Sequence, residues 1–132
     1  MTATHDMSHV ERASPFSFEL TVQRVSQAIS NAGMEVFAAI DHAANARAVG
    51  LSMRGAVVLI YGNAKGGTPI MLATPRSALD LPLHVLVREE ADGRTIVSFH
   101  AIATMLEAAG VRAALALRLE PAQDILFKAI EP

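Results

Sequence analysis

The sequence predicts an α+β fold in which an antiparallel or mostly antiparallel sheet of about four to five strands is backed by helices. The run 56–61 is continuously apolar and β-branched, which is typical of a buried strand. Two segments of alternating polarity, 83–88 and 95–99, flank Asp92-Gly93, a strong signal for the tight turn of an antiparallel hairpin. Segments with helical spacing precede and follow the strand 56–61, and further helices are predicted at the C-terminus.

The size and composition of the chain indicate one domain. The chain has 132 residues, enough for a single hydrophobic core. Hydrophobic residues make up 52% of it and charged residues 18%, an apolar balance for a monomer. We therefore expect some apolar surface to be buried between subunits. The polar segment 1–14 is predicted to be a disordered leader, and 15–132 a single α+β domain.

The first half of the domain is predicted as strand, helix, strand and short helix. The alternation over 16–20 predicts a strand. The helix that follows has apolar residues at helical spacing and ends at Gly33, which suits the left-handed C-terminal position. A second strand is predicted over 34–40. Asp41 then stands at an N-cap position and opens a short helix that runs through Ala48.

The second half is predicted to contain a central strand, the hairpin and several helices. The strand over 56–61 is expected to be central and covered on both faces. After the glycine-rich loop, Thr68 is predicted to cap a helix with Pro69 in its first turn, ending before Pro75. From about 101 to 130 the chain is predicted to be helical, with a possible break at Gly110 and a new segment starting at Pro121.

Charge and composition argue against several function classes. The net charge is −2, from 11 basic and 13 acidic residues without a run of either sign, so we expect no nucleic-acid partner. No basic amphipathic helix or long apolar run predicts a membrane role, and a cytoplasmic location is expected. Cysteine is absent and the histidines show no metal-ligand spacing, so we expect neither a metal nor a cofactor.

The first candidate site is Asp41-His42 with Asn45 one turn further on. An aspartate beside a histidine could polarise the imidazole for acid–base work near neutral pH. The alternative is that Asp41 is an N-cap and His42 a partly exposed residue of the first turn. Adjacent side chains on a helix do not face each other, which makes a dyad geometrically poor.

The second candidate site is the loop from Gly62 to Thr68. Its glycines would let backbone N–H groups turn toward an anion, and Lys65 would add a positive charge. The alternative is a strand-to-helix turn that needs glycine for its backbone angles. The loop lacks the ending of a Walker A motif. Its candidate ligand-binding residues are Gly62, Asn63, Lys65, Gly67 and Thr68.

The third candidate is Asp80, which precedes Leu81-Pro82 at the entrance to a strand. It could face the same end of the sheet as the glycine loop, which would place a carboxylate and the Lys65 ammonium in one pocket. The alternative, which we favour, is that Asp80 is a turn residue ahead of proline.

Taken together, three ordered motifs resemble those of the domain-of-unknown-function 302 family (DUF302), which includes the TT1751-like proteins. They are 40–46, 62–71 and 78–83, and the resemblance covers roughly 22–99. It implies an α+β fold of TATA-binding-protein-like topology, which carries no implication about DNA, and a homodimer. No established activity comes with it. The polar positions that it maps are Asp41, His42, Gly62, Asn63, Gly67, Thr68, Asp80 and Pro82.

The chain departs from the family pattern in and beyond the hairpin. His84 stands where members often carry lysine, and Arg88 where they carry an aromatic residue. Phe99-His100-Ala101-Ile102 replaces a stretch that usually contains tyrosine and aspartate. If that tyrosine or aspartate serves a family function, this chain has lost it, so His84 and His100 are the substitutions to follow.

Three hypotheses about function remain. We favour a homodimeric module that binds a small ligand or anion near Asp41-His42 and the Gly62–Thr68 loop. The second hypothesis is an enzyme of unknown reaction, with His42 as general acid or base and Lys65 and Asp80 assisting. The third is a structural or assembly partner without a ligand, whose motifs are caps and turns.

Overall fold

The computed structural model describes residues 8–132, which form one antiparallel five-stranded sheet and the helices packed on it. The strand order is β1-β5-β4-β3-β2, so sequence neighbours β2, β3, β4 and β5 lie side by side and β1 closes the far edge. The strands are β1 (His9–Ser14), β2 (Glu35–Asp41), β3 (Ala56–Gly62), β4 (Leu83–Glu89) and β5 (Thr95–His100). The helices are α1 (Phe18–Asn31), α2 (His42–Ala48), α3 (Ala64–Ala73), η1 (Pro75–Asp80), α4 (Ile102–Ala108), α5 (Ala113–Ala116), η2 (Leu117–Leu119) and α6 (Pro121–Lys128).

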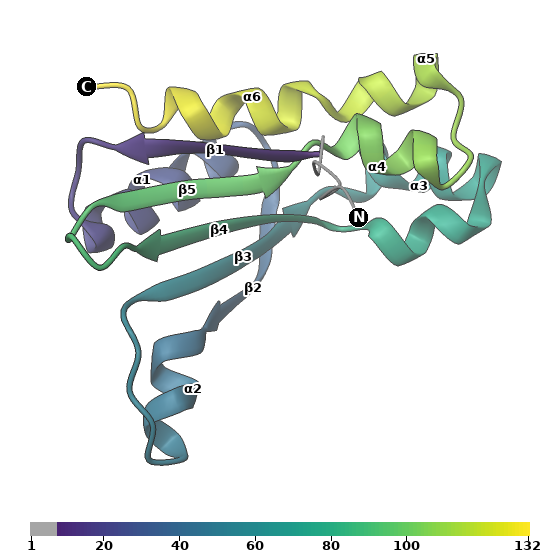
Figure 1. Cartoon of the computed structure of the whole chain (residues 1–132). Coiled ribbons are helices and arrows are strands. Elements are labelled where there is room, and N and C mark those ends of the chain that lie inside the picture. The colour runs from purple at the N-terminus through teal and green to yellow at the C-terminus, as the bar shows by residue number, and fades with distance from the viewer. Residues whose placement is uncertain (1–7) are drawn as a thin grey trace, which may run out of the picture.

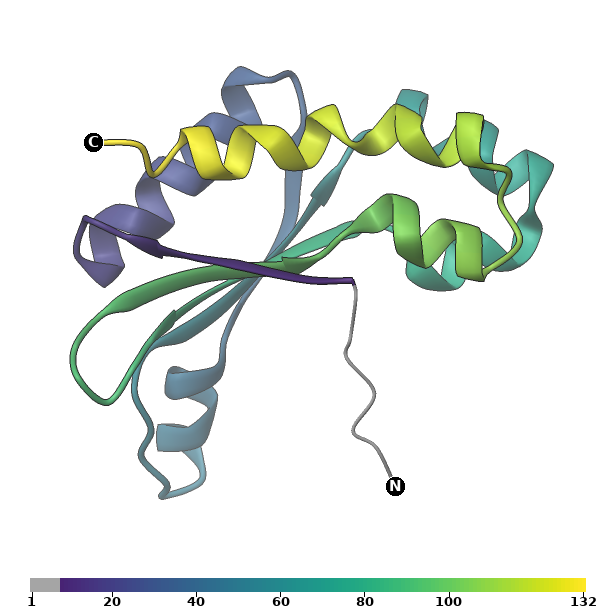
Figure 2. The ribbon, with the colours of Figure 1, turned by 45° about the horizontal axis from the view of Figure 1, so that its top comes forward.

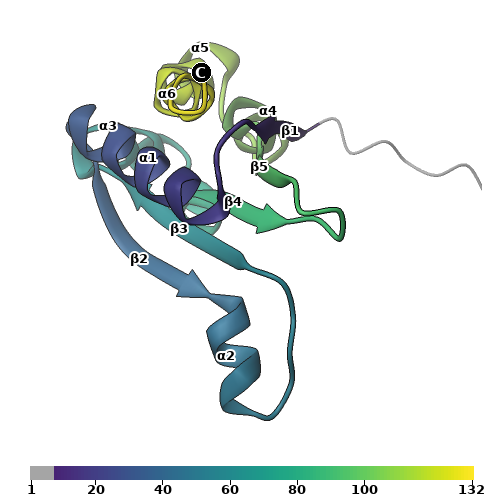
Figure 3. The same ribbon diagram turned by 90° about the vertical axis from the view of Figure 1, so that its left-hand side faces the viewer.

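The helices are distributed unevenly about the sheet. α1 and α6 lie on one face, as the view along the strands shows (Figure 3). α3, α4 and α5 gather at one end of the sheet, where β3 and β5 finish and β4 begins (Figure 1). α2 extends away from the opposite end on an arm formed by β2 and β3 (Figure 2). The fold is therefore the predicted α+β sheet backed by helices.

The strand registers separate a buried face of the sheet from an open one. Opposite residues of antiparallel strands point to the same side, so Leu59 and Val85, which pair, both enter the core. Val58 and Leu86, the next pair, lie on the open face and are half-buried. β3 is thus an interior strand, but the expectation that both its faces are covered is wrong, because the helices pack on one face.

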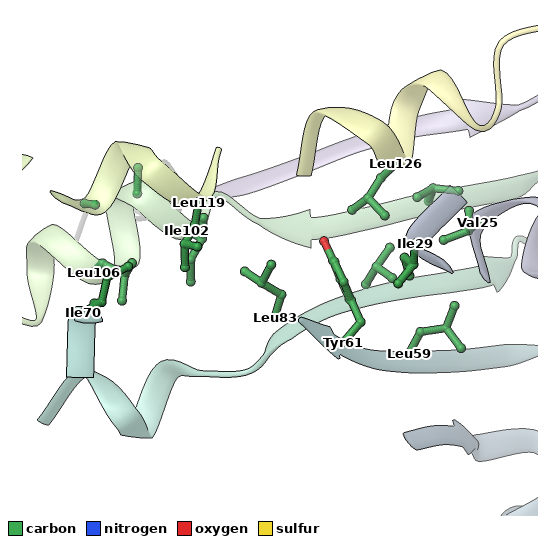
Figure 4. Close-up of a cluster of buried hydrophobic side chains, with 14 of the residues drawn as sticks. Val25, Ile29, Leu59, Tyr61, Ile70, Leu83, Ile102, Leu106, Leu119 and Leu126 are labelled. Atoms are coloured by element: carbon green, nitrogen blue, oxygen red, sulfur yellow. The ribbon is translucent and has the colours of Figure 1, made fainter. Parts of the chain in front are cut away.

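The core continues from the sheet into the helical end of the molecule. Figure 4 shows Tyr61 standing between Leu83 and Ile29, with Leu126 of α6 above them. A further group, which includes Ile70 and Leu106, lies where α3, α4 and η2 meet. All of these side chains are at most 4% exposed. Their burial by several helices at once fixes the end of β3 and the start of α3, where the site lies.

The N-terminal prediction needs two corrections. His9–Ser14 is not part of a disordered leader but forms β1, paired with β5; residues 1–7 of the predicted leader lie outside the described residues. The predicted strand 16–20 is also wrong, because Ser17 caps α1 and its hydroxyl accepts a hydrogen bond from the Leu20 N–H at 3.2 Å. The alternation of polar and apolar residues there covers the first turn of a helix.

The middle of the chain follows the prediction more closely. Gly33 has φ +80°, the left-handed angle expected after α1, and β2 follows as predicted. Asp41 caps α2, accepting a hydrogen bond from the Ala44 N–H at 2.9 Å. The predicted cap at Thr68 is wrong, because Asn63 caps α3 and Thr68 lies inside that helix. Residues after Pro75 form the 3₁₀ helix η1, which was not predicted.

The C-terminal third is helical, as predicted, with the break at Gly110 and a new helix at Pro121. Gly110 has φ +97°, and Pro121 occupies the first turn of α6. Ala101, at the N-cap position of α4, has no capping side chain. Gln123 of α6 takes over that role: its Oε1 accepts from the Ile102 N–H at 3.0 Å, and its Nε2 donates to the His100 carbonyl at 2.8 Å.

Within residues 8–132 no helix has both the length and the apolar character needed to cross a membrane. The expected cytoplasmic location stays a prediction.

Candidate functional site

A pocket of about 550 Å³ opens where β3 ends, between the start of α3 and the start of α6. Tyr61 and Gly62 form its wall at the end of β3, Met34 reaches it from the residue before β2, and Phe37 reaches it from β2. Leu119 and Ile125 close the side toward η2 and α6. Such a volume lies within the range of small-molecule sites, which are concave and mostly apolar.

The chemistry of the lining is strongly one-sided. Most of the side chains are apolar, and Arg118 of η2 carries the one formal charge among the described residues that line the pocket. Arg118 is exposed, and no ion pair ties it to an acidic residue within 8–132. Glu35 pairs with the lining residue Gly62 in the sheet, and Glu120 follows the lining residue Leu119 in the chain. Neither glutamate lines the pocket. The pocket therefore combines an apolar body with a cationic rim.

Tyr61 is a structural part of the pocket wall. Its side chain is fully buried, and its hydroxyl donates a hydrogen bond to the Ala122 carbonyl at 2.9 Å. Burial raises the pKa of Tyr61 well above the ordinary value of a phenol, since the phenolate would lose its hydration. The hydroxyl is thus neutral, already bonded, and unsuited to acid–base chemistry near neutral pH.

The glycines of the loop set how closely the backbone approaches the pocket. Gly62 has φ +154°, an angle that other residues rarely adopt. A side chain at Gly66 would meet Asn63 Oδ1 at 3.3 Å and Leu119 Cδ2 at 3.4 Å, which is tight. A Cβ atom added at Gly67 would lie 3.8 Å from Leu81 Cδ1 and from Met71 Cε, so a small side chain fits there. Gly67 is the point at which the pocket can be filled by mutation.

The start of α3 presents fewer unpaired backbone N–H donors to an anion than its glycine-rich sequence predicts. Asn63 Oδ1 accepts a hydrogen bond from the Gly66 N–H at 2.7 Å, and the Asn63 carbonyl accepts one from the Gly67 N–H. The cap therefore uses donors that a phosphate-binding loop would present to its ligand.

Four of the predicted ligand-binding residues line this pocket: Gly62, Asn63, Gly67 and Thr68. Lys65 stands between lining residues, and its exposed side chain is outside the lining. The structure thus brings together most of the glycine-loop candidates, with the lysine at the margin.

Asp41, His42 and Asn45 lie elsewhere. Asp41 pairs with Val57 at the beginning of β3, whereas the pocket is at Gly62, its end. At a rise of about 3.4 Å per residue, these two points of β3 are about 17 Å apart. Asp41 serves as the cap of α2, the alternative considered from the sequence. The enzyme hypothesis requires His42 and Lys65 to meet at one substrate position, and within one chain they do not.

Asp80 lines a second, smaller hollow of about 280 Å³ between the open face of the sheet and the helical end. His9, His84 and His100 also line it. Within residues 8–132 no group of three or more histidine, cysteine, aspartate or glutamate residues is placed to hold a metal ion. Asp80 ends η1 ahead of Leu81-Pro82, in keeping with the favoured turn interpretation, and it does not share a pocket with Lys65, which lines neither hollow.

Two histidines of this hollow, His9 and His100, belong to a polar network on the open face. The ring of His9 lies edge-on to His100 at 5.8 Å between centroids, and Ser8 Oγ is 2.8 Å from His100 Nδ1. His9 Nε2 also lies 2.9 Å from Glu11 Oε2, and Arg88 Nη1 is 3.2 Å from the same oxygen. The hydrogen bond from His9, assisted by Arg88, holds the pKa of Glu11 below its ordinary value. These contacts tie β1 to the sheet.

Several pocket residues were missed from the sequence. They include Met34, Tyr61, Leu119 and Ile125, which are residue types typical of a core. Nothing in the local sequence pattern distinguishes a pocket wall from packed interior. Arg118 is one of two arginines, with Arg112, in the Ala- and Leu-rich stretch 108–119. That signal is weak without the fold.

The fold and the pocket define a single-sheet α+β protein with an apolar cavity at one end of its sheet. The chain belongs to the DUF302 family, described as "Domain of unknown function DUF302", whose profile matches residues 10–131. A solved structure of an uncharacterized conserved DUF302 protein from Bacillus stearothermophilus superposes with a TM-score of 0.80. The match covers 94% of this chain and 96% of that one at 16% identity, and so shows the shared fold alone.

Curated relatives include proteins named fluoride-specific ion channel FluC 1, from Brucella suis biovar 1 and Brucella abortus biovar 1. Each is 33% identical to this chain over 94 residues, which is 71% of the chain. The chain spans only 37% and 35% of the length of these two relatives, respectively. The match therefore concerns a part of each relative.

Proposed function

We propose that this protein is a small-molecule-binding module and that its ligand occupies the pocket between β3, α3 and α6. The observation that carries the proposal is the pocket itself, a concave apolar space of about 550 Å³ with a few polar groups. Sites of this size and composition are those that bind small organic ligands in other proteins. The glycine-loop half of the predicted site contributes to it, whereas Asp41, His42 and Asn45 do not.

The apolar lining supports binding rather than catalysis. Its one tyrosine hydroxyl is engaged with the Ala122 carbonyl, and Asn63 is engaged as a cap. Arg118 and Thr68 are left as polar side chains at the exposed rim. Neither is a nucleophile activated by a neighbouring base, which a covalent or acid–base mechanism would need.

The test is a thermal-shift screen of small organic molecules on the wild type and two variants at Gly67. Gly67→Leu fills the pocket, and Gly67→Ala is the matched control because its Cβ reaches only ordinary van der Waals distance. A ligand of the native state raises the melting temperature by mass action. We expect hits that stabilise the wild type and Gly67→Ala but not Gly67→Leu. Hits that stabilise all three equally, or no hit in a broad screen, would contradict the proposal.

We also propose that the protein is a homodimer. Apolar residues crowd the tip of the arm beyond α2, where Val49, Leu51 and Met53 are 72%, 66% and 49% exposed. An exposed apolar group of this kind is typical of an interaction surface, and a second copy of the chain would cover it. In light-scattering measurements after gel filtration, Leu51→Asp should shift the protein toward monomer. Leu79→Asp is the control, since Leu79 is 89% exposed in η1. A monomeric wild type would refute the dimer.

A second candidate function is suggested by the relatives named fluoride-specific ion channels. On this proposal the chain is an accessory module that acts with a fluoride channel. The pocket does not suit the ion itself, because fluoride would lose its hydration among apolar side chains. Deleting the coding sequence should then lower the fluoride tolerance of the host cells. Unchanged tolerance in a strain with its channel intact would contradict this candidate.

A further inference from the structure

We propose that the ligand of the pocket is an amphipathic anion: an apolar chain or ring system that bears one carboxylate or similar acidic head. This inference rests on the proposed small-molecule function and adds the class of ligand and its orientation. The apolar part lies against Tyr61 and Ile125, and the head lies at the rim beside Arg118.

The charge of the pocket gives the sign of the head group. Arg118 is the one charged residue in the lining among the described residues, and no acidic residue of 8–132 forms an ion pair with it. A guanidinium presents several donors in a planar fork that matches a carboxylate. A cationic ligand would instead meet Arg118 with no acidic side chain in the lining to compensate.

The interior of the pocket gives the orientation. Its deep wall is Tyr61, whose hydroxyl is already bonded to the Ala122 carbonyl, so a polar head placed there would lose its hydration without gaining a partner. The other side chains that line the interior of the pocket, which include Met34, Leu83 and Ile125, are apolar. A ligand therefore gains most by burying its hydrocarbon there and leaving the acidic head at the exposed rim.

The polar groups at the rim are few, which limits the head to a small one. Asn63 and its carbonyl use the Gly66 and Gly67 N–H groups, so α3 adds little toward an anion. Arg118 and the Thr68 hydroxyl are the side chains available to a head group there. One guanidinium suits a monoanion better than a multiply charged phosphate.

The experiment compares three ligands with chains of ten carbon atoms: decanoate, whose chain includes the carboxylate carbon, decanol and decyltrimethylammonium, each below its micellisation or solubility limit. Binding is followed by the fluorescence of Tyr61, since the chain has one tyrosine and no tryptophan and this buried residue belongs to the pocket wall. We expect decanoate to bind about threefold to fivefold more tightly than decanol, the range for an exposed charge pair. The ammonium should bind most weakly.

Two arginine variants test the role of Arg118. Arg118→Gln should abolish the preference for decanoate over decanol by weakening the binding of decanoate. Arg112→Gln is the matched control, since Arg112 is exposed, close in sequence and outside the lining, and it should keep the preference.

The outcomes separate this inference from the function on which it rests. Equal binding of decanoate and decanol, with both lost in Gly67→Leu, would overturn the anionic class and leave the small-molecule function standing. A preference for decanoate that survives in Arg118→Gln would also overturn the inference. No binding of any probe, together with no hit in the thermal-shift screen, would overturn both.

Discussion

Removing one oxygen atom from the pocket wall tests how Tyr61 joins β3 to α6. Tyr61→Phe deletes the hydrogen bond to the Ala122 carbonyl, which measures 2.9 Å, and keeps the ring that packs in the core. A single buried hydrogen bond contributes about 0.5–1.5 kcal/mol to stability. Ala122 lies inside α6, so its carbonyl retains a helical partner, and the cost of an unsatisfied acceptor is not added.

We therefore expect Tyr61→Phe to lower the free energy of unfolding by about 1 kcal/mol, which is about 4 °C in melting temperature for a domain of this size. Urea unfolding followed by circular dichroism measures it, since the variant has no tyrosine to report by fluorescence. Thr104→Val, which removes an exposed hydroxyl from α4, is the control and should change little. A loss near zero would show that the hydroxyl does not hold α6, and a loss above about 3 kcal/mol would show that the ring itself repacks.

Three further predictions concern stability. When the pH is raised, the phenolate absorbance of Tyr61 should appear together with unfolding. The pKa of Tyr61 is raised in the folded state, so the stability that the buried neutral phenol contributes is complete below about pH 10 and is lost at higher pH. Phenolate formation in a still-folded protein near pH 10 would contradict this. Gln123→Leu leaves the Ile102 N–H and the His100 carbonyl without this partner and should cost about 2–4 kcal/mol in urea unfolding, against under about 0.5 kcal/mol for the exposed Gln23→Leu. Gly55→Ala should cost about 1–3 kcal/mol, because a Cβ there lies 2.9 Å from the Phe18 ring and from Glu89 Oε1; a neutral effect would show that this loop adjusts freely.

The parts of the fold that the sequence predicts well are those in which local chemistry and tertiary structure agree. Asp92-Gly93 between two alternating segments gave the β4–β5 hairpin, and Asp41 gave the start of α2. In both cases a short-range signal, a turn or a cap, is sufficient by itself. The apolar run of β3 likewise gave a buried strand, although its half-exposed face required knowledge of where the helices lie.

β1 was missed because its inward residues are not the alternating apolar side chains of a typical strand. Arg12 faces the core side, where its guanidinium lies 4.2 Å from the centre of the Phe127 ring, and Ser14 Oγ is 2.7 Å from Thr21 Oγ1. The strand is held by partners distant in sequence, which no local pattern reveals.

Only the glycine-loop half of the candidate site was predictable, because the other half also depends on segments distant in sequence. The glycine loop is a continuous segment whose composition attracts notice, and it does line the pocket. The opposite wall comes from η2 and α6, about fifty residues later, and consists of ordinary apolar residues with Arg118. Asp41 and His42 were grouped with the loop because both segments place polar residues at the starts of elements in an otherwise apolar chain. The antiparallel pairing of β2 and β3 instead separates them by the length of β3.

The most direct test of the central claim is to map ligand binding on the backbone amides by nuclear magnetic resonance, with decanoate and the hits of the thermal-shift screen as probes. We expect chemical-shift changes at Gly62, Gly67 and Thr68 and at the start of α6, with α2 and the hollow near His84 unaffected. Changes confined to α2 or to that hollow, or none with any probe, would contradict the assignment of the pocket as the binding site.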